Sequence, residues 1–183
     1  MPPKQRITRE MILERSFAMF CEEGMEAVNA RSVAKALNCS TQPIFSYFAG
    51  MEDLRNAIEQ KAKDTFTQVM EDVSAEGSFT ACSTAYIRLA SEQPRLFTRL
   101  LMSVTEEEPL TLVAEGVEER LKGGLSGQYG LDAQQADSLY RELWTYAHGL
   151  ASLVAAGRLA FDEQAIAGRM AFAGDALAQK IKG

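Results

Sequence analysis

The residue types that most often catalyse reactions or bind metals are few in this sequence. His148 is the one histidine, and Cys21, Cys39 and Cys82 are three widely spaced cysteines. A single histidine excludes a histidine-cluster metal site, and an odd number of distant cysteines disfavours a disulfide framework or a CxxC metal site. The pair Gly123-Gly124 lacks the Lys-Ser/Thr of a phosphate loop, and the sequence has no nucleophile elbow. We therefore expect no metal and no cofactor.

A short segment near the N-terminus carries side chains that suit the edges of DNA bases. A helix is predicted over residues 41–47, and Thr41, Gln42, Pro43 and Ser46 are its candidate base contacts. A glutamine amide can pair with adenine through two hydrogen bonds, worth about 1–3 kcal/mol of discrimination between bases. Proline offers only an apolar contact, for example with a thymine methyl group. The segment predicts a helix that reads bases in the major groove.

Two further helices must position this one. The first begins after Thr8, its predicted N-cap, and ends at Gly24; the second covers residues 30–37 with Asn29 as N-cap. The linker Asn38-Cys39-Ser40 is so short that Asn38 is expected in the left-handed conformation, and Ser40 is expected to cap the third helix. Two short helices joined by a tight turn after a longer helix predict a helix-turn-helix domain.

The rest of the chain predicts helices and no strand, so the expected fold is all-α with about nine helices. A long helix begins after Gly50, and Asp132 with Gln135, and Asp162, are expected N-caps. Pro94, Pro109, the stretch Gly123–Gly130 and Gly157 are expected to separate helices. The predicted helices cover residues 79–92, 95–105, 110–122, 133–156 and 163–181. We expect a DNA-binding domain at residues 1–50 and a C-terminal domain at residues 51–183.

The charge is divided unevenly along the chain. The net charge is -6, but residues 1–50 carry +1 and residues 51–183 carry -7. The first nine residues hold three cations and no acid, and residues 1–6 predict a mobile basic arm. The acidity therefore belongs to the C-terminal part and does not exclude DNA binding by the N-terminal part. No apolar run approaches the roughly 20 residues of a membrane span and no signal peptide is evident, so we expect a cytoplasmic protein without membrane contact.

The segment from Arg6 to Ile58 resembles the N-terminal domain of the TetR family of bacterial transcriptional regulators. The C-terminal part resembles a subgroup with a Trp…His-Gly signature, through Glu92–Phe97 and Trp144–Gly149. The family commonly has Lys where Met51 stands, and Lys-Gly where Thr41-Gln42 stands, so two cations are missing here. The matching residues of the N-terminal domain are Ile12-Leu13, Phe20, Gly24, Arg31-Ser32-Val33-Ala34, Ser40, Ile44-Phe45-Ser46-Tyr47-Phe48 and Leu54.

This resemblance implies a DNA-binding regulator, a repressor that a small molecule releases from its operator. It implies that Phe45 and Tyr47 lie against the sugar-phosphate backbone, where Tyr47 can donate to a phosphate. Phe48 is expected in the core, and Phe45 fits core and contact equally well. The other expected DNA contacts are Arg31 and Ser32 with a phosphate, Lys4 and Arg6 with the backbone or minor groove, and Ser40, whose first role is the cap. Arg31 also fits an ordinary solvated position.

The last two helices predict a homodimer on a palindromic operator, because one recognition helix with few cations binds weakly. Small residues on them suit close helix packing, either between subunits or within one. They are Gly149, Ala151, Ala155 and Ala156 in one helix, and Ala165, Gly168, Ala171, Gly174 and Ala178 in the other.

The expected effector site of the C-terminal domain is a set of aromatic and other large side chains that fit either an apolar pocket or ordinary core. They are Tyr86, Phe97, Met102, Tyr140, Trp144 and His148. Two other functions stay open at this point. One is an all-α enzyme that uses His148 with Glu142 or Cys82. The other is a protein-interaction module without DNA binding.

Overall fold

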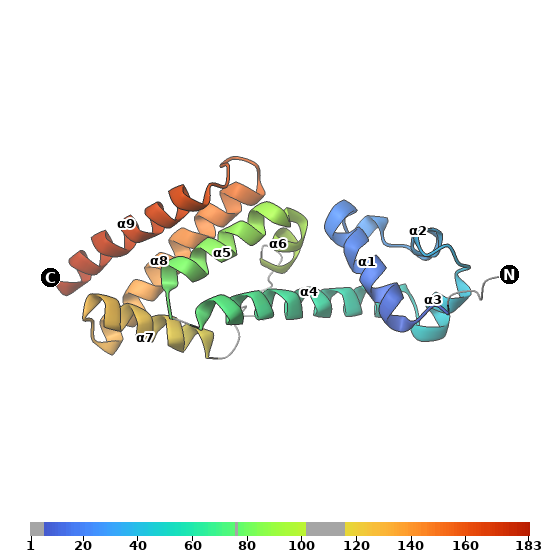
Figure 1. Cartoon of the computed structure of the whole chain (residues 1–183), viewed down its shortest axis with the longest axis horizontal. Coiled ribbons are helices and arrows are strands. Elements are labelled where there is room, and N and C mark those ends of the chain that lie inside the picture. Colours follow the sequence, from blue (N-terminus) through green and yellow to red (C-terminus); the bar gives the residue numbers. More distant parts are fainter. Residues whose placement is uncertain (1–5, 76, 102–115) are drawn as a thin grey trace. The chain divides into compact units, whose positions relative to one another are not determined.

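The structure is a computed structural model that describes residues 6–75, 77–101 and 116–183. These residues form helices and no strand, which confirms the all-α prediction (Figure 1). The chain divides into two compact units, residues 1–64 and 65–183, and the division falls inside one long helix. The expected boundary of the DNA-binding domain at residue 50 stays a prediction. The helices are α1 (Arg9–Glu23), the 3-10 helix η1 (Met25–Ala27), α2 (Ala30–Ala36), α3 (Gln42–Tyr47), α4 (Met51–Ser74), α5 (Phe79–Glu92), α6 (Pro94–Leu101), α7 (Val117–Tyr129), α8 (Ala133–Ala155) and α9 (Glu163–Lys182).

In the first unit, local capping sets where α1 and α2 begin. Thr8 Oγ1 accepts a hydrogen bond from the Met11 N–H at 3.2 Å, as predicted. Asn29 and Ser32 form a capping box at the start of α2, which satisfies two otherwise unpaired backbone N–H groups. The core of this unit consists of buried apolar residues from α1–α4 and of Phe48, which follows α3. The helical residues include Ile12, Met19, Phe20, Val33, Ile44, Leu54 and Ile58.

The turn between α2 and α3 follows the prediction at Asn38 and departs from it at Ser40. Asn38 has φ 51°, the left-handed conformation that asparagine tolerates best among residues with a side chain. The predicted cap at Ser40 is wrong, because the N-cap of α3 is Thr41, in helical conformation and without a side-chain capping bond. Pro43 lies in the first turn of α3, where its missing N–H has no partner to lose.

In the second unit, α5, α8 and α9 pack against one another, and α7 packs against α8 (Figure 1). The predicted caps are confirmed: Asp132 and Gln135 form a capping box before α8, and Asp162 caps α9. Among the described residues, no helix is long and apolar enough to cross a membrane. The core side chains include Phe66, Met70, Ile87, Leu96, Leu121, Leu139 and Leu143.

Helix α7 corrects the expectation that the glycine stretch separates two helices. The predicted end of a helix at residue 122 is wrong, because α7 runs from Val117 to Tyr129 and ends at Gly130 with φ 61°. Val117, Leu121 and Leu125 are buried at helical spacing, so the apolar period continues through the glycines. Residues 102–115, including Pro109 and parts of two predicted helices, lie outside the described residues.

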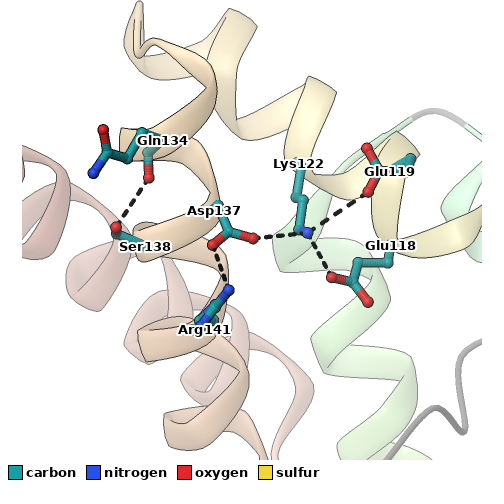
Figure 2. A network of polar contacts seen from close by, with 7 residues as sticks. All are labelled: Glu118, Glu119, Lys122, Gln134, Asp137, Ser138 and Arg141. Atoms are coloured by element: carbon teal, nitrogen blue, oxygen red, sulfur yellow. Dashed lines mark hydrogen bonds and ion pairs between the residues drawn. The ribbon is translucent and has the colours of Figure 1, made fainter.

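Charged side chains connect α7 to α8 (Figure 2). Lys122 Nζ lies 2.8 Å from Asp137 Oδ1 and 2.6 Å from Glu118 Oε1, and Arg141 reaches the other oxygen of Asp137 at 2.8 Å. The hydrogen bonds to Asp137 and Glu118 raise the pKa of Lys122, and the bond to Lys122 lowers the pKa of Asp137. Each group is therefore held in its charged form at neutral pH.

Candidate functional site

Helix α3 presents a mixed polar and aromatic face to solvent. Gln42, Phe45 and Ser46 are exposed at spacings of three and four residues, which places them on one side of the helix. Ile44 is fully buried on the other side, and Phe48, just after the helix, is 1% exposed as expected of a core residue. Phe45 is 52% exposed, so of its two expected roles the structure excludes the core.

A groove of about 680 Å³ runs beside this face within the first unit. It brings together six of the predicted DNA-contacting residues: Arg6, Ser40, Gln42, Pro43, Ser46 and Tyr47. The other groove residues are Ile7, which follows the arm, Leu37 at the end of α2, and Asn38 and Cys39 of the turn. Thr41, Phe45, Arg31 and Ser32 are not part of its lining, and Lys4 lies outside the described residues.

Hydrogen bonds already occupy several hydroxyl groups at this site. Ser46 Oγ donates to the Gln42 carbonyl oxygen at 2.9 Å, and Tyr47 Oη donates to the Ile7 carbonyl oxygen at 3.3 Å. Ser32 Oγ accepts the Asn29 N–H in the capping box of α2 and donates to the Asn29 carbonyl oxygen. Within the described residues, the side-chain amide of Gln42 makes no hydrogen bond. Among the polar side chains of α3, Gln42 is therefore the one whose hydrogen-bonding groups are available to a binding partner.

The Arg6 and Arg31 side chains are exposed and free to meet an anion, whereas Arg9 is partly engaged. The Arg9 guanidinium lies 4.7 Å from the centre of the Phe48 ring, in a cation–π arrangement. The chain just after the arm is thus held at two points, by Arg9 of α1 against Phe48 and by the Ile7 carbonyl oxygen, which accepts from Tyr47. These contacts hold Arg6 at the edge of the groove.

In the second unit, the predicted effector residues form one continuous aromatic cluster. The Tyr86 ring is fully buried and lies 5.4 Å from Phe97 and 4.9 Å from Trp144, centre to centre. Trp144 stacks on Tyr140 at 6.2 Å with 9° between the ring planes. Met102, the remaining predicted member, lies outside the described residues.

Sequence reasoning missed two members of this cluster, Phe66 and Phe79. Phe66 of α4 meets Tyr86 edge-on at 6.0 Å, and Phe79 meets Tyr140 edge-on at 5.7 Å. Both lie in helices that the sequence predicts, but nothing local in the sequence distinguishes a ring that joins this cluster from any other core ring. The cluster thus draws on α4, α5, α6 and α8.

His148 lies at the edge of the cluster and is hydrogen-bonded to its centre. Tyr86 Oη and His148 Nδ1 are 2.7 Å apart, and the Phe97 ring lies 6.0 Å from the imidazole. Burial lowers the pKa of His148, so the ring is neutral at neutral pH. Burial also raises the pKa of Tyr86, which keeps its hydroxyl proton. In the tautomer protonated on Nε2, Nδ1 accepts a hydrogen bond from the Tyr86 hydroxyl, and Nε2–H is left as a donor.

Two family profiles match the sequence, and together they cover both units. Residues 12–58 match the bacterial regulatory proteins of the tetR family, and residues 79–173 match the Tetracyclin repressor-like, C-terminal domain. The second match alone covers more than half of the chain. The chain belongs to the TetR family. It is a DNA-binding transcriptional regulator, and in this family repression and release by a ligand are typical.

Solved structures of TetR-family regulators and other bacterial regulators share this fold at low sequence identity. A TetR-like transcriptional regulator from Rhodococcus sp. RHA1 is 14% identical, with 92% of this chain and 96% of that chain covered and a TM-score of 0.63. The fatty acid degradation regulator FadR from Bacillus halodurans is 14% identical over 95% and 97%, with a TM-score of 0.57. The ketosteroid transcriptional regulator KstR2 of Mycobacterium tuberculosis is 14% identical over 93% and 96%, with a TM-score of 0.55. Among curated proteins, no sequence matches the chain.

Helices α8 and α9 of this TetR-family chain expose large apolar side chains that sequence reasoning had not selected. Phe172 is 76% exposed, Leu153 49% and Tyr146 37%. Tyr146 and Leu153 share one face of α8 with Gly149, and Phe172 shares one face of α9 with Gly168, at spacings of three, four or seven residues. A Cβ added to either glycine would meet no atom within 4 Å.

Three of the small residues expected to allow close helix packing are packed inside the protomer. Ala151 and Ala178 are buried, and a Cβ added to Gly174 would lie 2.6 Å from Tyr129 Oη. For these three residues the structure shows the second of the two expected arrangements, close packing within one subunit. Gly149, Ala156, Ala165, Gly168 and Ala171 are exposed.

Proposed function

We propose that the chain is a homodimeric repressor that binds a palindromic operator through α3 and the arm, and leaves it when a small molecule binds in the second unit. The observation that carries the DNA-binding surface is the groove beside α3. It combines a free glutamine amide at Gln42 with an exposed cation at Arg6. The amide suits a base edge and the cation a phosphate. Arg31 on α2 supplies a second exposed cation.

Selection from random double-stranded DNA with the full-length protein tests this surface. We expect two inverted half-sites with centres about one helical turn, or 34 Å, apart, because a two-fold dimer repeats its recognition helix. Arg31→Ala should weaken binding to all selected sequences alike, since a phosphate contact carries no base information. Arg158→Ala, an exposed cation of the second unit, is the matched control. No saturable complex at low salt would exclude the function.

We propose the exposed faces of α8 and α9 as the dimer interface. Three large apolar side chains beside two open glycines form the kind of surface that a second copy covers. Phe172→Glu would place a charge in that interface and should convert the dimer to a monomer in sedimentation equilibrium. Gln128→Glu adds the same charge on α7 and should leave the dimer intact. A wild-type monomer at the concentrations that bind DNA would contradict the proposal.

We propose the aromatic cluster as the effector site and a small, largely apolar molecule as the effector. Aromatic rings with one polar group at the edge, the Tyr86–His148 pair, match the composition of ligand pockets. Trp144 is the only tryptophan of the chain, so its fluorescence reports on this cluster alone. A saturable change in Trp144 emission that parallels release of DNA supports the site. Release without any change in emission would contradict it.

We propose that the protein has no enzymatic activity of its own. The alternative used His148 with Cys82 or Glu142, but burial raises the pKa of Cys82 to about 12, so its thiol stays protonated. His148 directs Nδ1 to Tyr86, and Glu142 is an exposed residue of α8. Among the described residues, no three His, Cys, Asp or Glu side chains form a metal site. Turnover that survives deletion of residues 1–50 and is lost in His148→Ala would overturn this proposal.

A further inference from the structure

The DNA-facing part of the first unit contains no charged side chain along an unusually long stretch. From Ala36 to Met51 the sequence holds no Lys, Arg, His, Asp or Glu, and this stretch includes the turn, α3 and the start of α4. Arginine and lysine are the side chains that most often identify guanine, through its O6 and N7 acceptors. Glutamate and aspartate accept from cytosine N4. None of these side chains is available on α3.

The side chains that α3 does expose favour A·T pairs over G·C pairs. The Gln42 amide makes no hydrogen bond within the described residues, and its paired donor and acceptor match adenine N7 and N6. Phe45 is 52% exposed on the same face, three residues along. An apolar ring at a base edge has one favourable partner in the major groove, the 5-methyl group of thymine.

The remaining polar groups on this surface carry little base information. Ser46 Oγ and Tyr47 Oη already donate to the carbonyl oxygens of Gln42 and Ile7. The hydroxyls of Ser40 and Thr41 can serve either base pair, because a hydroxyl both donates and accepts. Gln42 and Phe45 therefore dominate the choice of sequence at α3.

We propose that each operator half-site presents A·T pairs to α3, with an adenine bound by the Gln42 amide and a neighbouring thymine methyl group packed on the Phe45 ring. This inference rests on the proposed DNA-binding function and specifies the sequence class that the same surface selects. Arg6 contributes charge at the edge of the groove, and α3 contributes the identity of the bases.

The first experiment compares the half-sites selected from random DNA by the wild-type dimer and by Gln42→Arg. The wild type should return A·T pairs at the central positions of the half-site. Gln42→Arg should change one of them to G·C, since an arginine at that place binds guanine O6 and N7. Central G·C pairs selected by the wild type would overturn the inference while leaving the DNA-binding function intact. No selected sequence at all would instead remove the function itself.

The second experiment uses base analogues in the selected operator to test each contact. Replacing the adenine by 7-deazaadenine removes N7 and should weaken wild-type binding about tenfold, and the loss should disappear in Gln42→Ala. Replacing the thymine by uracil removes one methyl group and should cost about fourfold, a loss that should disappear in Phe45→Ala.

Each variant is the control for the other contact. Phe45→Ala should keep the full effect of 7-deazaadenine, and Gln42→Ala the full effect of uracil. Because both side chains are exposed, the thermal unfolding of the variants should match that of the wild type. Analogue effects that persist unchanged in both variants would overturn the assignment of Gln42 and Phe45.

Discussion

Tyr86 and His148 show how one buried hydrogen bond can define the chemistry of an otherwise apolar cluster. The phenol is fully buried and meets His148 Nδ1 at 2.7 Å, with aromatic rings on its other sides. An unpaired buried hydroxyl would cost about 1–3 kcal/mol, so the imidazole satisfies a group that the rings cannot. The pair therefore fixes the orientation of His148 and leaves its Nε2–H without a role in this bond.

Burial of His148 predicts that the protein loses stability as the pH falls. The pKa of His148 is lowered in the folded state, while an unfolded histidine titrates near 6.5. Below about pH 6.5 the histidine of the unfolded chain is protonated, whereas His148 of the folded chain stays neutral. The free energy of unfolding therefore decreases with decreasing pH until the folded pKa is passed. Above about pH 6.5 the histidine is neutral in both the folded and the unfolded chain, and this loss of stability is absent. The Tyr86 hydroxyl, whose pKa burial raises, stays protonated throughout.

Urea unfolding at several pH values between 5 and 8 measures this effect. His148→Gln should show a flatter dependence on pH across that range than the wild type. The lowered pKa of Asp137 also removes stability in acid, but only as the pH falls toward the ordinary carboxylate range near 4. Equal slopes for wild type and His148→Gln would contradict the role of His148.

Among the elements, α7 depends on one glycine for its position. A Cβ added to Gly124 would lie 1.9 Å from the Gly77 carbonyl oxygen and 2.8 Å from its carbon, both backbone atoms that cannot move aside alone. Gly77 itself has φ 68°, in the left-handed region. The segment that connects α4 to α5 thus passes directly over the helix at a place where only glycine fits.

Gly124→Ala should destabilise the protein by about 1–3 kcal/mol, because the cost of this overlap exceeds the gain in helix propensity that alanine brings. Gly123→Ala is the matched control one residue earlier, because nothing lies within 4 Å of its added Cβ. Alanine there should stabilise the protein by about 0.5–1 kcal/mol, the usual advantage over glycine inside a helix. Chemical denaturation measures both values, and a stabilising Gly124→Ala would show that the two segments do not touch.

The same elements show what a sequence can and cannot predict. Thr8, Asn29, Asp132 and Asp162 were recognisable as caps because a cap depends on residues three positions away. The place of Gly124 inside a helix was not recognised, because the backbone that it packs against, at Gly77, is distant in sequence. Five groove residues were predicted together because they are neighbours on one helix and one turn: Ser40, Gln42, Pro43, Ser46 and Tyr47. Ile7 and residues 37–39 were not predicted, because only the folded structure brings them beside that helix.

The surface of α8 and α9 was predicted less well than the groove. Which of its alanines and glycines point outward depends on where α5 and α7 pack, and a helical pattern of small residues contains no such information. The exposed Phe172, at 76%, departs from the burial expected of a phenylalanine, and such departures become visible only in the folded structure.

On the scale of the whole molecule, the division of charge predicts how DNA binding responds to salt. Residues 1–50 carry +1 and residues 51–183 carry -7, and the exposed arginines proposed for phosphate contact are Arg6 and Arg31. Each neutralised phosphate contributes about 0.9 to the slope of log K against log salt concentration. A dimer with these contacts should therefore show a slope of about -4, shallow for a regulator of DNA.

Arg31→Ala should reduce the magnitude of that slope by about 2 for the dimer, and Arg158→Ala should not change it. Fluorescence anisotropy of a labelled operator between 50 and 200 mM salt measures the three slopes. A wild-type slope near about -10 would mean that the dimer contacts many more phosphates than Arg6 and Arg31 can account for, and would contradict this prediction.

Helix α4 provides a physical route by which an effector could control DNA binding. Leu54 and Ile58 of α4 are buried in the core of the first unit, and Phe66 of the same helix is buried against Tyr86 in the second. Because Phe66 packs against Tyr86, a ligand that displaces Tyr86 also changes the packing of Phe66 and so acts on α4. Only a difference in ligand affinity between two positions of α4 can then change the affinity for DNA.

Phe66→Leu tests this route, because leucine keeps the site apolar but removes the ring edge that meets Tyr86. The variant should bind the operator with an affinity close to that of the wild type, since α1–α3 are unchanged. Its loss of operator affinity at saturating effector should be several-fold smaller than in the wild type, as expected when one packed contact in the coupling is removed. Lys63→Ala, an exposed position on α4, should respond to the effector as the wild type does. If both variants retain the full response while Trp144 emission still reports binding, the coupling passes through another element, and α5 or α6 around Tyr86 and Phe97 becomes the place to test next.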